Sequence, residues 1–149
     1  MREGETPRNK IGDVMHYHEP GYILTKRATF AAAHYLPGHP KCGHIHGHTW
    51  RVEVEFGADV PNPETGMVVD FAELDAGIQE ILPDHKLLNE VYSFSPTAEN
   101  LAYQFWHELD RLWKDRIYAV TVWESENSSV RFSPGTYAYW QAGRERGLC

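Results

Sequence analysis

The chain has few cysteines, no long apolar run and no excess of positive charge. Its two cysteines, Cys42 and Cys149, lie far apart in the sequence, and a cytoplasmic compartment keeps such thiols reduced, so we expect chemistry or packing at Cys42 before a disulfide. No apolar stretch approaches the roughly 20 residues of a membrane helix, and the opening MREGETPRNK lacks the apolar core of a signal peptide. The net charge of -7 comes without a local basic patch. We therefore expect a cytoplasmic protein with neither a membrane nor a nucleic-acid partner.

The chain does contain enough apolar material for one packed domain. It has 149 residues, of which 42% are hydrophobic and 13% aromatic, and a chain of this size buries roughly two-thirds of its unfolded surface. Residues 1–19 are polar and show no periodicity. We predict an N-terminal arm there and a single domain over residues 20–149.

Patterns of apolar residues predict two strands, two helices and two further strands, in that order. The strand segments alternate between apolar and polar residues or are rich in β-branched and aromatic ones. This order predicts an α+β domain in which a four-stranded antiparallel sheet carries both helices on one face. The strands are expected at residues 22–35, 48–56, 117–124 and 128–135.

Each predicted helix has a capping residue and one apolar face. Asp70 is placed to cap the first helix and Pro83 to end it, while Ser95 or Thr97 caps the second. Apolar residues then recur at helical spacing. The predicted faces comprise Phe71, Leu74, Ile78, Ile81 and Leu82 in the first helix, and Leu101, Ala102, Phe105, Leu109 and Leu112 in the second.

The segment CGHIHGH concentrates side chains that bind metal ions. His46 and His48 lie two residues apart at the entry to a strand, where residues i and i+2 face the same way. His34, near the end of the preceding strand, would lie alongside them if the two strands pair as a hairpin. Three neutral imidazoles with one open position are typical of a catalytic zinc site. We predict that these three histidines bind Zn²⁺, although an isolated HxH is also common in surface loops.

Two further histidines, His39 and His44, lie in the same loop without a strand period to organise them. We expect both to be solvated. Cupins also use an HxH metal motif, but two amphipathic helices in the middle of the chain argue against that class.

The sequence alone allows two roles each for Cys42, for the Asp84–His85 pair and for Glu124. Cys42, four residues before His46, is either a fourth ligand that closes a structural site or a thiolate that faces the open coordination position. Asp84 and His85 form either a proton relay or an ordinary helix-terminal pair. Glu124 ends an apolar strand, where it is either exposed to solvent or anchors the N–H groups of a ligand.

Six fragments occur in a fixed order: FAAAHYL, C-x-x-x-H-G-H, MVVDFAEL, DHKLLN, PTAENLA and VTVWE. Together they resemble the 6-pyruvoyl-tetrahydropterin synthase and 6-carboxy-tetrahydropterin synthase family. The resemblance runs from about Tyr22 to Arg131. The spacing between the cysteine and HGH is more similar to the bacterial 6-carboxy-tetrahydropterin synthases than to the animal pyruvoyl enzymes.

The resemblance implies the tunnelling fold, in which trimers close a twelve-stranded barrel and two trimers stack into a hexamer. In the family a neighbouring subunit supplies the catalytic Asp-His pair. The resemblance thus implies zinc ligands at His34, His46 and His48, catalytic residues at Cys42, Asp84 and His85, and a pterin-ring anchor at Glu124.

The implied activity is that of a zinc-dependent lyase. It converts 7,8-dihydroneopterin triphosphate to 6-carboxy-tetrahydropterin, with loss of triphosphate and acetaldehyde, on the way to deazapurines such as queuosine. The alternatives are a pyruvoyl-type synthase that keeps the side-chain carbons and a zinc-stabilised pterin-binding module without turnover. Because the chain is acidic, cations must be gathered where the triphosphate binds, and the candidates are Lys41, Lys86 and Arg131.

Overall fold

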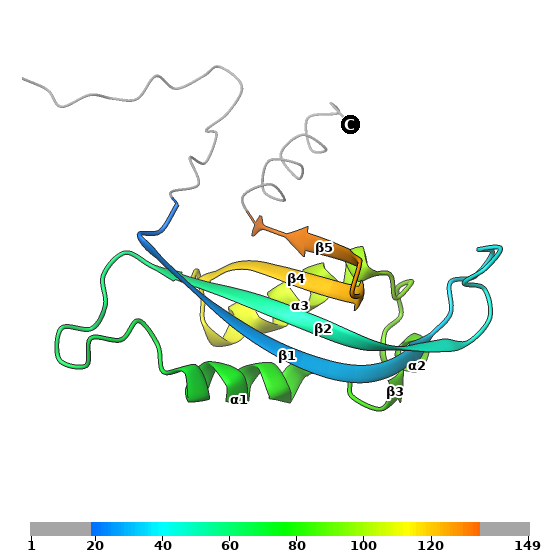
Figure 1. The fold of residues 1–149 in the computed structure, drawn as a ribbon, viewed down its shortest axis with the longest axis horizontal. Coiled ribbons are helices and arrows are strands. Elements are labelled where there is room, and N and C mark those ends of the chain that lie inside the picture. The colour runs from blue at the N-terminus through cyan, green and yellow to red at the C-terminus, as the bar shows by residue number, and fades with distance from the viewer. Residues whose placement is uncertain (1–18, 135–149) are drawn as a thin grey trace, which may run out of the picture. The chain divides into compact units, whose positions relative to one another are not determined.

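The computed structural model describes residues 19–134, in which a sheet is packed against helices (Figure 1). The predicted arm and the C-terminal part of the predicted domain fall almost entirely outside these residues. No helix in the described part is both long and apolar enough to cross a membrane. The elements are β1 (Tyr22–His34), β2 (His46–Ala58), α1 (Phe71–Ile81), β3 (Lys86–Leu87), α2 (Leu88–Val91), α3 (Ala98–Leu112), β4 (Ile117–Ser125) and β5 (Ser128–Phe132).

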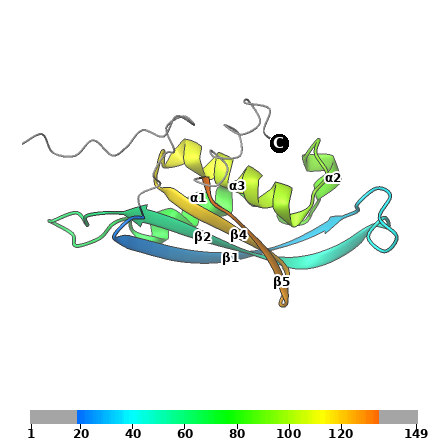
Figure 2. The ribbon, with the colours of Figure 1, turned by 90° about the horizontal axis from the view of Figure 1, so that it is seen from above.

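The sheet is built on a long antiparallel pair, β1 and β2. The pairing runs over all 13 residues of each strand, from Tyr22 opposite Ala58 to His34 opposite His46. The predicted alternation in β2 is confirmed, because its even-numbered residues from position 50 to 58 are buried. The helices cover this buried face, as Figure 2 shows. The α+β class and the tunnelling fold are therefore confirmed.

The sheet has five strands in the order β3-β1-β2-β4-β5, not the four that were predicted. The four long strands lie where they were expected and are antiparallel. The additional strand β3 pairs parallel with β1 at Ala32 and Ala33, so the prediction of a purely antiparallel sheet is wrong. Two residues are too few to show a strand period, and the four-residue helix α2 was missed for the same reason.

The core lies between the sheet and the helices α1 and α3. Asp70 caps α1 by accepting a hydrogen bond from the Ala72 N–H at 2.7 Å, and Thr97 caps α3 by accepting one from Asn100. Both caps agree with the sequence. The hydrophobic residues of α1 and α3 with no exposed surface are Leu74, Ile78, Leu101, Ala102, Phe105 and Leu109.

Two residues assigned to the apolar faces are exposed. Phe71 is 54% exposed and Leu112 is 50% exposed. Each is a terminal residue of its helix. Helical spacing gives the direction of a side chain but not whether the sheet extends far enough to cover it. The predicted burial of Phe71 and Leu112 is therefore wrong.

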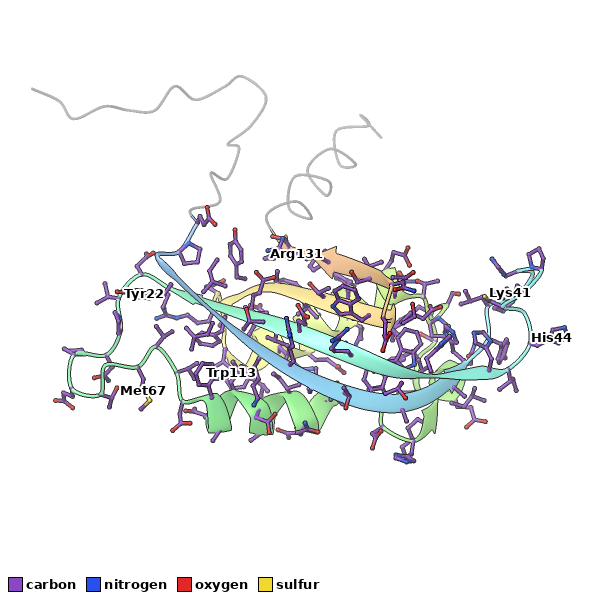
Figure 3. The ribbon with its side chains drawn as sticks, viewed as in Figure 1. Tyr22, Lys41, His44, Met67, Trp113 and Arg131 are labelled. Carbon is purple, nitrogen blue, oxygen red and sulfur yellow. The ribbon has the colours of Figure 1, made fainter. Side chains whose placement is uncertain are left out.

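The packing of α1 depends on a glycine. A Cβ atom at Gly77 would overlap the ring of Trp113, which follows α3 and also packs edge-to-face on Phe56 at 6.1 Å between ring centroids. Figure 3 shows Trp113 next to α1. Glycine inside a helix is normally less favourable than alanine by about 1 kcal/mol. At this position the contact with Trp113 outweighs that preference.

We predict that Gly77→Ala lowers the free energy of unfolding by about 1–3 kcal/mol, because overpacking displaces the Trp113 ring. Chemical denaturation measures the effect. In a Trp113→Leu background the same substitution is expected to be neutral or stabilising, since helix propensity then decides. A more stable Gly77→Ala single variant would contradict the packing argument.

Candidate active site

Three imidazoles converge where β1 ends and β2 begins. His34 is opposite His46, and His48 is opposite Ala32, so all three histidines lie on the face that carries Trp50 and the core. The ring centroids lie 4.6 Å apart for His34 and His46, 4.9 Å for His46 and His48, and 5.2 Å for His34 and His48. One nitrogen from each ring lies within 4.8 Å of the others. The three histidines that the sequence singled out form a group able to hold a metal ion.

Backbone carbonyls fix the orientation of two of these rings. Nδ1 of His34 lies 2.8 Å from the Pro96 carbonyl oxygen, and Nδ1 of His46 lies 2.7 Å from that of His44. A carbonyl oxygen only accepts hydrogen bonds, so each Nδ1 carries a proton, and in the neutral ring each Nε2 carries a lone pair. The two Nε2 atoms are 3.0 Å apart. Two lone pairs at this distance repel unless a proton or a metal ion lies between them, and the outer carbonyl bonds are typical of metal-binding histidines.

The third ring, His48, has a buried nitrogen without a hydrogen bond. Its Nε2 finds no hydrogen-bond partner in the described part of the chain and lies 3.5 Å from Oε1 of Glu124. Burial lowers the pKa of His48; Glu124 opposes this shift, and His34 and His46 add to it. The neutral imidazole is the form that binds metal ions. An orphaned nitrogen on a neutral ring fits a metal ligand.

Trp50 forms the apolar wall behind the cluster. It is fully buried, and its ring stands edge-on to His34 at 5.0 Å and to His48 at 5.3 Å between centroids. Its indole N–H donates to the Ala32 carbonyl at 3.2 Å, which satisfies the one polar atom of the side chain. The wall holds two of the three imidazoles in place.

Glu124 brings a carboxylate to the edge of the cluster. Val122 of β4 is opposite Val52 of β2, so Glu124, two residues further on, lies on the same face as the histidines. Its side chain is 31% exposed. A polar residue at the end of an apolar strand was the signal in the sequence, and the structure brings that residue close to His48.

Cys42 lies in the loop between β1 and β2, at the end of the sheet where Figure 3 labels Lys41 and His44. It is half-buried and not in a disulfide. Among the described residues, the group of converging ligand atoms consists of the three histidines and does not include Cys42. Cys42 is therefore not placed as a fourth ligand in this structure.

The Asp84–His85 pair stands at the β3 edge of the sheet. Oδ1 of Asp84 accepts the Ala31 N–H at 2.8 Å, and Oδ2 lies 2.8 Å from Nδ1 of His85. These bonds, the one from Ala31 first, lower the pKa of Asp84. The ionised carboxylate holds the proton on Nδ1 and leaves Nε2 of His85 free to exchange a proton. His85 is 83% exposed and has a φ of 56°, which is uncommon for a residue other than glycine.

The Asp84–His85 pair lies at the edge of β1 and not within the histidine cluster. His85 borders an open depression whose lining includes odd-numbered strand residues, which face away from the three histidines, and also His48 of the cluster. No hydrogen bond or ring contact joins His85 to the cluster within the described residues. The strand residues that line the depression are Ala31, Ala32, Ala33, Gly47, His48, Thr49, Lys86 and Leu87.

Asn89 of α2 supports the site and was missed from sequence. Its side-chain oxygen accepts the Tyr35 N–H at 2.9 Å and its amide group donates to the Tyr35 carbonyl at 2.9 Å. Asn89 thus pairs with the backbone as a strand would, directly after His34. Such a clamp has no local sequence pattern, because the two residues are 54 positions apart.

The three candidate cations for the triphosphate differ in whether a carboxylate already binds them. Arg131 is bound to Glu55 through Nε at 2.8 Å and Nη2 at 3.2 Å, so its proposed role with a triphosphate is not supported. Lys86 lines the depression beside His85. Lys41 lies next to Cys42. Neither lysine makes an ion pair in the part of the chain that the structure describes.

These features define a tunnelling-fold protein whose three-histidine cluster is able to hold a metal ion. The family model of 6-pyruvoyl tetrahydropterin synthase matches residues 23–134, and the chain belongs to that family.

Relatives with two different names resemble the chain. A provisionally named 6-carboxy-5,6,7,8-tetrahydropterin synthase of Archaeoglobus fulgidus is 43% identical over 93 residues, which cover 61% of this chain and 78% of the relative. The 6-carboxy-5,6,7,8-tetrahydropterin synthase of Synechocystis is 36% identical over 122 residues and covers 76% of this chain and 95% of its own. Among solved structures, 6-pyruvoyl tetrahydropterin synthase of Caenorhabditis elegans aligns with a TM-score of 0.69 and 25% identity, covering 78% of this chain and 98% of that one.

We predict that the protein binds about one divalent metal ion per chain, as expected for three imidazoles around one position. The double variant His46→Ala, His48→Ala should lose the ion, because one ligand alone does not hold it. His44→Ala is the matched control from the same loop and should keep it. Elemental analysis of metal-replete protein measures the content, and metal that persisted undiminished in the double variant would exclude this site.

Proposed function

We propose that the protein is a zinc-dependent 6-carboxy-tetrahydropterin synthase of the cytoplasm. It would convert 7,8-dihydroneopterin triphosphate and water to 6-carboxy-tetrahydropterin, triphosphate and acetaldehyde, on the route to deazapurines such as queuosine. The observation that carries the proposal is the convergence of imidazole nitrogens from His34, His46 and His48 beside the loop of Cys42. Relatives in Archaeoglobus, Synechocystis and Haemophilus influenzae bear the name of this enzyme.

The three histidines would hold the zinc ion and leave one coordination position open. When bound, zinc supplies a Lewis acid for the side-chain oxygens of the substrate. The lowered pKa of His48 and the bonds from Nδ1 of His34 and His46 to backbone carbonyls support this assignment.

Proton transfer is assigned to Cys42 and to the Asp84–His85 pair. Cys42, as a thiolate, removes or relays a proton of the substrate side chain. His85 assists through Nε2, because Asp84 engages Nδ1. Asp84 itself is held by the Ala31 N–H, which keeps the imidazole in one orientation.

Glu124 is assigned to the pterin ring. Its carboxylate would accept charge-assisted hydrogen bonds from the guanidine-like edge of the ring. Its place on the cluster face of the sheet, 3.5 Å from Nε2 of His48, supports this role. The ring would then lie beside the histidine cluster.

We further propose a homohexamer of two stacked trimers. The proposed site combines the cluster of one chain with the Asp-His pair of a neighbouring chain, because no hydrogen bond or ring contact joins the two groups within one chain among the described residues. On its outer edge β1 is paired only at Ala32 and Ala33 within the described residues, and an unpaired edge of this length is a site for further strand pairing. Assembly into a ring would cover that edge.

A pyruvoyl-type reaction is the second candidate. The Caenorhabditis elegans structure and a 31% identical relative in Dictyostelium discoideum bear the names of pyruvoyl enzymes. Such an enzyme also removes triphosphate but retains the side-chain carbons.

Incubation with 7,8-dihydroneopterin triphosphate, followed by mass spectrometry, is expected to give 6-carboxy-tetrahydropterin and acetaldehyde. Cys42→Ala should retain zinc and lose turnover by about 10²–10⁴-fold, the usual contribution of a general base. A 6-pyruvoyl product would support the second candidate. If the substrate binds without turnover and Cys42→Ala loses its zinc, the protein is a zinc-stabilised binding module instead.

A site shared between chains predicts complementation. Cys42→Ala and His85→Ala should each be inactive alone. After mixing and reassembly, about one site in four combines an intact cysteine with an intact Asp-His pair, if chains associate at random in a symmetric oligomer. Turnover should recover to about that fraction, with sedimentation equilibrium confirming the hexamer. A mixture of Cys42→Ala with Asp84→Ala gives the same arrangement, whereas Asp84→Ala with His85→Ala is the control that stays inactive.

A further inference from the structure

The loop between β1 and β2 contains a single helical turn that begins at His39. The Gly43 N–H donates to the His39 carbonyl at 3.0 Å, which is the i+4 to i bond of an α-helix. His39 is thus in the N-cap position, and Pro40 is the first residue of the turn, where a missing N–H costs nothing. Lys41 and Cys42 are the second and third residues. Their N–H groups have no partner inside the turn.

The His39 ring supplies that partner. Its Nδ1 accepts the N–H of Lys41 at 3.2 Å and the N–H of Cys42 at 2.9 Å. Capping side chains normally accept from the second or third residue in this way, and serine, threonine, aspartate and asparagine are the usual ones. At this position an imidazole takes their place, in the tautomer that carries its proton on Nε2. His39 is exposed, as the sequence predicts, but its ring is not merely solvated.

The turn holds Cys42 by both of its main-chain polar groups. Its N–H is bound by His39, and its carbonyl accepts the Leu36 N–H at 2.6 Å. The Leu36 carbonyl accepts in turn from the His39 N–H at 3.1 Å. A Cβ atom at Gly43 would lie 2.7 Å from the His39 carbonyl oxygen, so the turn closes only with glycine there. Where the Cys42 thiol points therefore depends on this small hydrogen-bonded unit.

We propose that His39 is a positioning residue for Cys42, acting as the N-cap of the turn that carries the thiol. The inference rests on the proposed role of Cys42 as the catalytic thiolate. His39 lies outside the group of metal-ligand atoms in the described residues. Its effect should therefore appear in turnover and not in metal content.

Two variants of His39 separate the effect of the capping hydrogen bonds from the effect of side-chain size. His39→Phe keeps a ring of similar size but has no acceptor. His39→Asn keeps an acceptor that reaches the second and third residues of a turn. In the full, zinc-loaded chain, His39→Phe should lower kcat by about 10–100-fold, as small misplacements of reacting groups do, with KM and zinc unchanged. His39→Asn should restore kcat to within about threefold, since asparagine is among the preferred caps.

A double variant tests whether His39 acts through Cys42. Adding His39→Phe to Cys42→Ala should cause no further loss of kcat, because residues that act as a unit are not additive. Equal turnover in His39→Phe and the parent chain, an additional loss in the double variant, or loss of zinc in His39→Phe would each overturn the proposal.

Amide hydrogen exchange over residues 39–43, followed by mass spectrometry, needs no substrate. We expect faster exchange in His39→Phe and parent-like exchange in His39→Asn. Unchanged exchange in His39→Phe would show that the ring does not cap the turn. If Cys42→Ala keeps full turnover, the catalytic role of Cys42 fails and the positioning role with it, while the exchange data still report whether the cap exists.

Discussion

The antiparallel register of β1 and β2 brings His34 opposite His46 and places His48 on the same face. A shift of one residue would turn every side chain of β2 to the other side of the sheet. The register is held by the core, because the residues that follow His48 at every second position are buried against the helices. The geometry of the histidine cluster and the packing of the core therefore depend on the same alternation.

Burying histidine at the end of the core requires polar partners. His34 is fully buried, and the Pro96 carbonyl accepts its Nδ1 proton from the segment just before α3. Asn89 holds the backbone of the next residue, Tyr35, through two hydrogen bonds. The segments around the helices thus help to hold the histidine cluster in place, as the sheet does. Loss of either partner would leave buried polar groups unsatisfied, which is costly in an apolar environment.

Sequence patterns predicted the elements that are long and the residues that are chemically distinctive. Strands of nine to 13 residues and helices with side-chain caps show their period clearly. The two-residue strand β3 shows none, and the exposure of Phe71 and Leu112 depends on where the sheet ends. The Asn89 clamp joins residues far apart in the chain. None of these features has a local signal.

The sequence by itself determined the ligand types and their common face, since side chains two apart on a strand point the same way. Only the tertiary structure decided which nitrogen of His34 faces the cluster, because the Pro96 carbonyl, 62 positions away, binds its Nδ1. It also attached the Asp84–His85 pair to the edge of β1, beside an open depression. The spacing of residues along the chain indicates which side chains are candidates for the site. Hydrogen bonds between distant segments decide which atoms of those side chains face it.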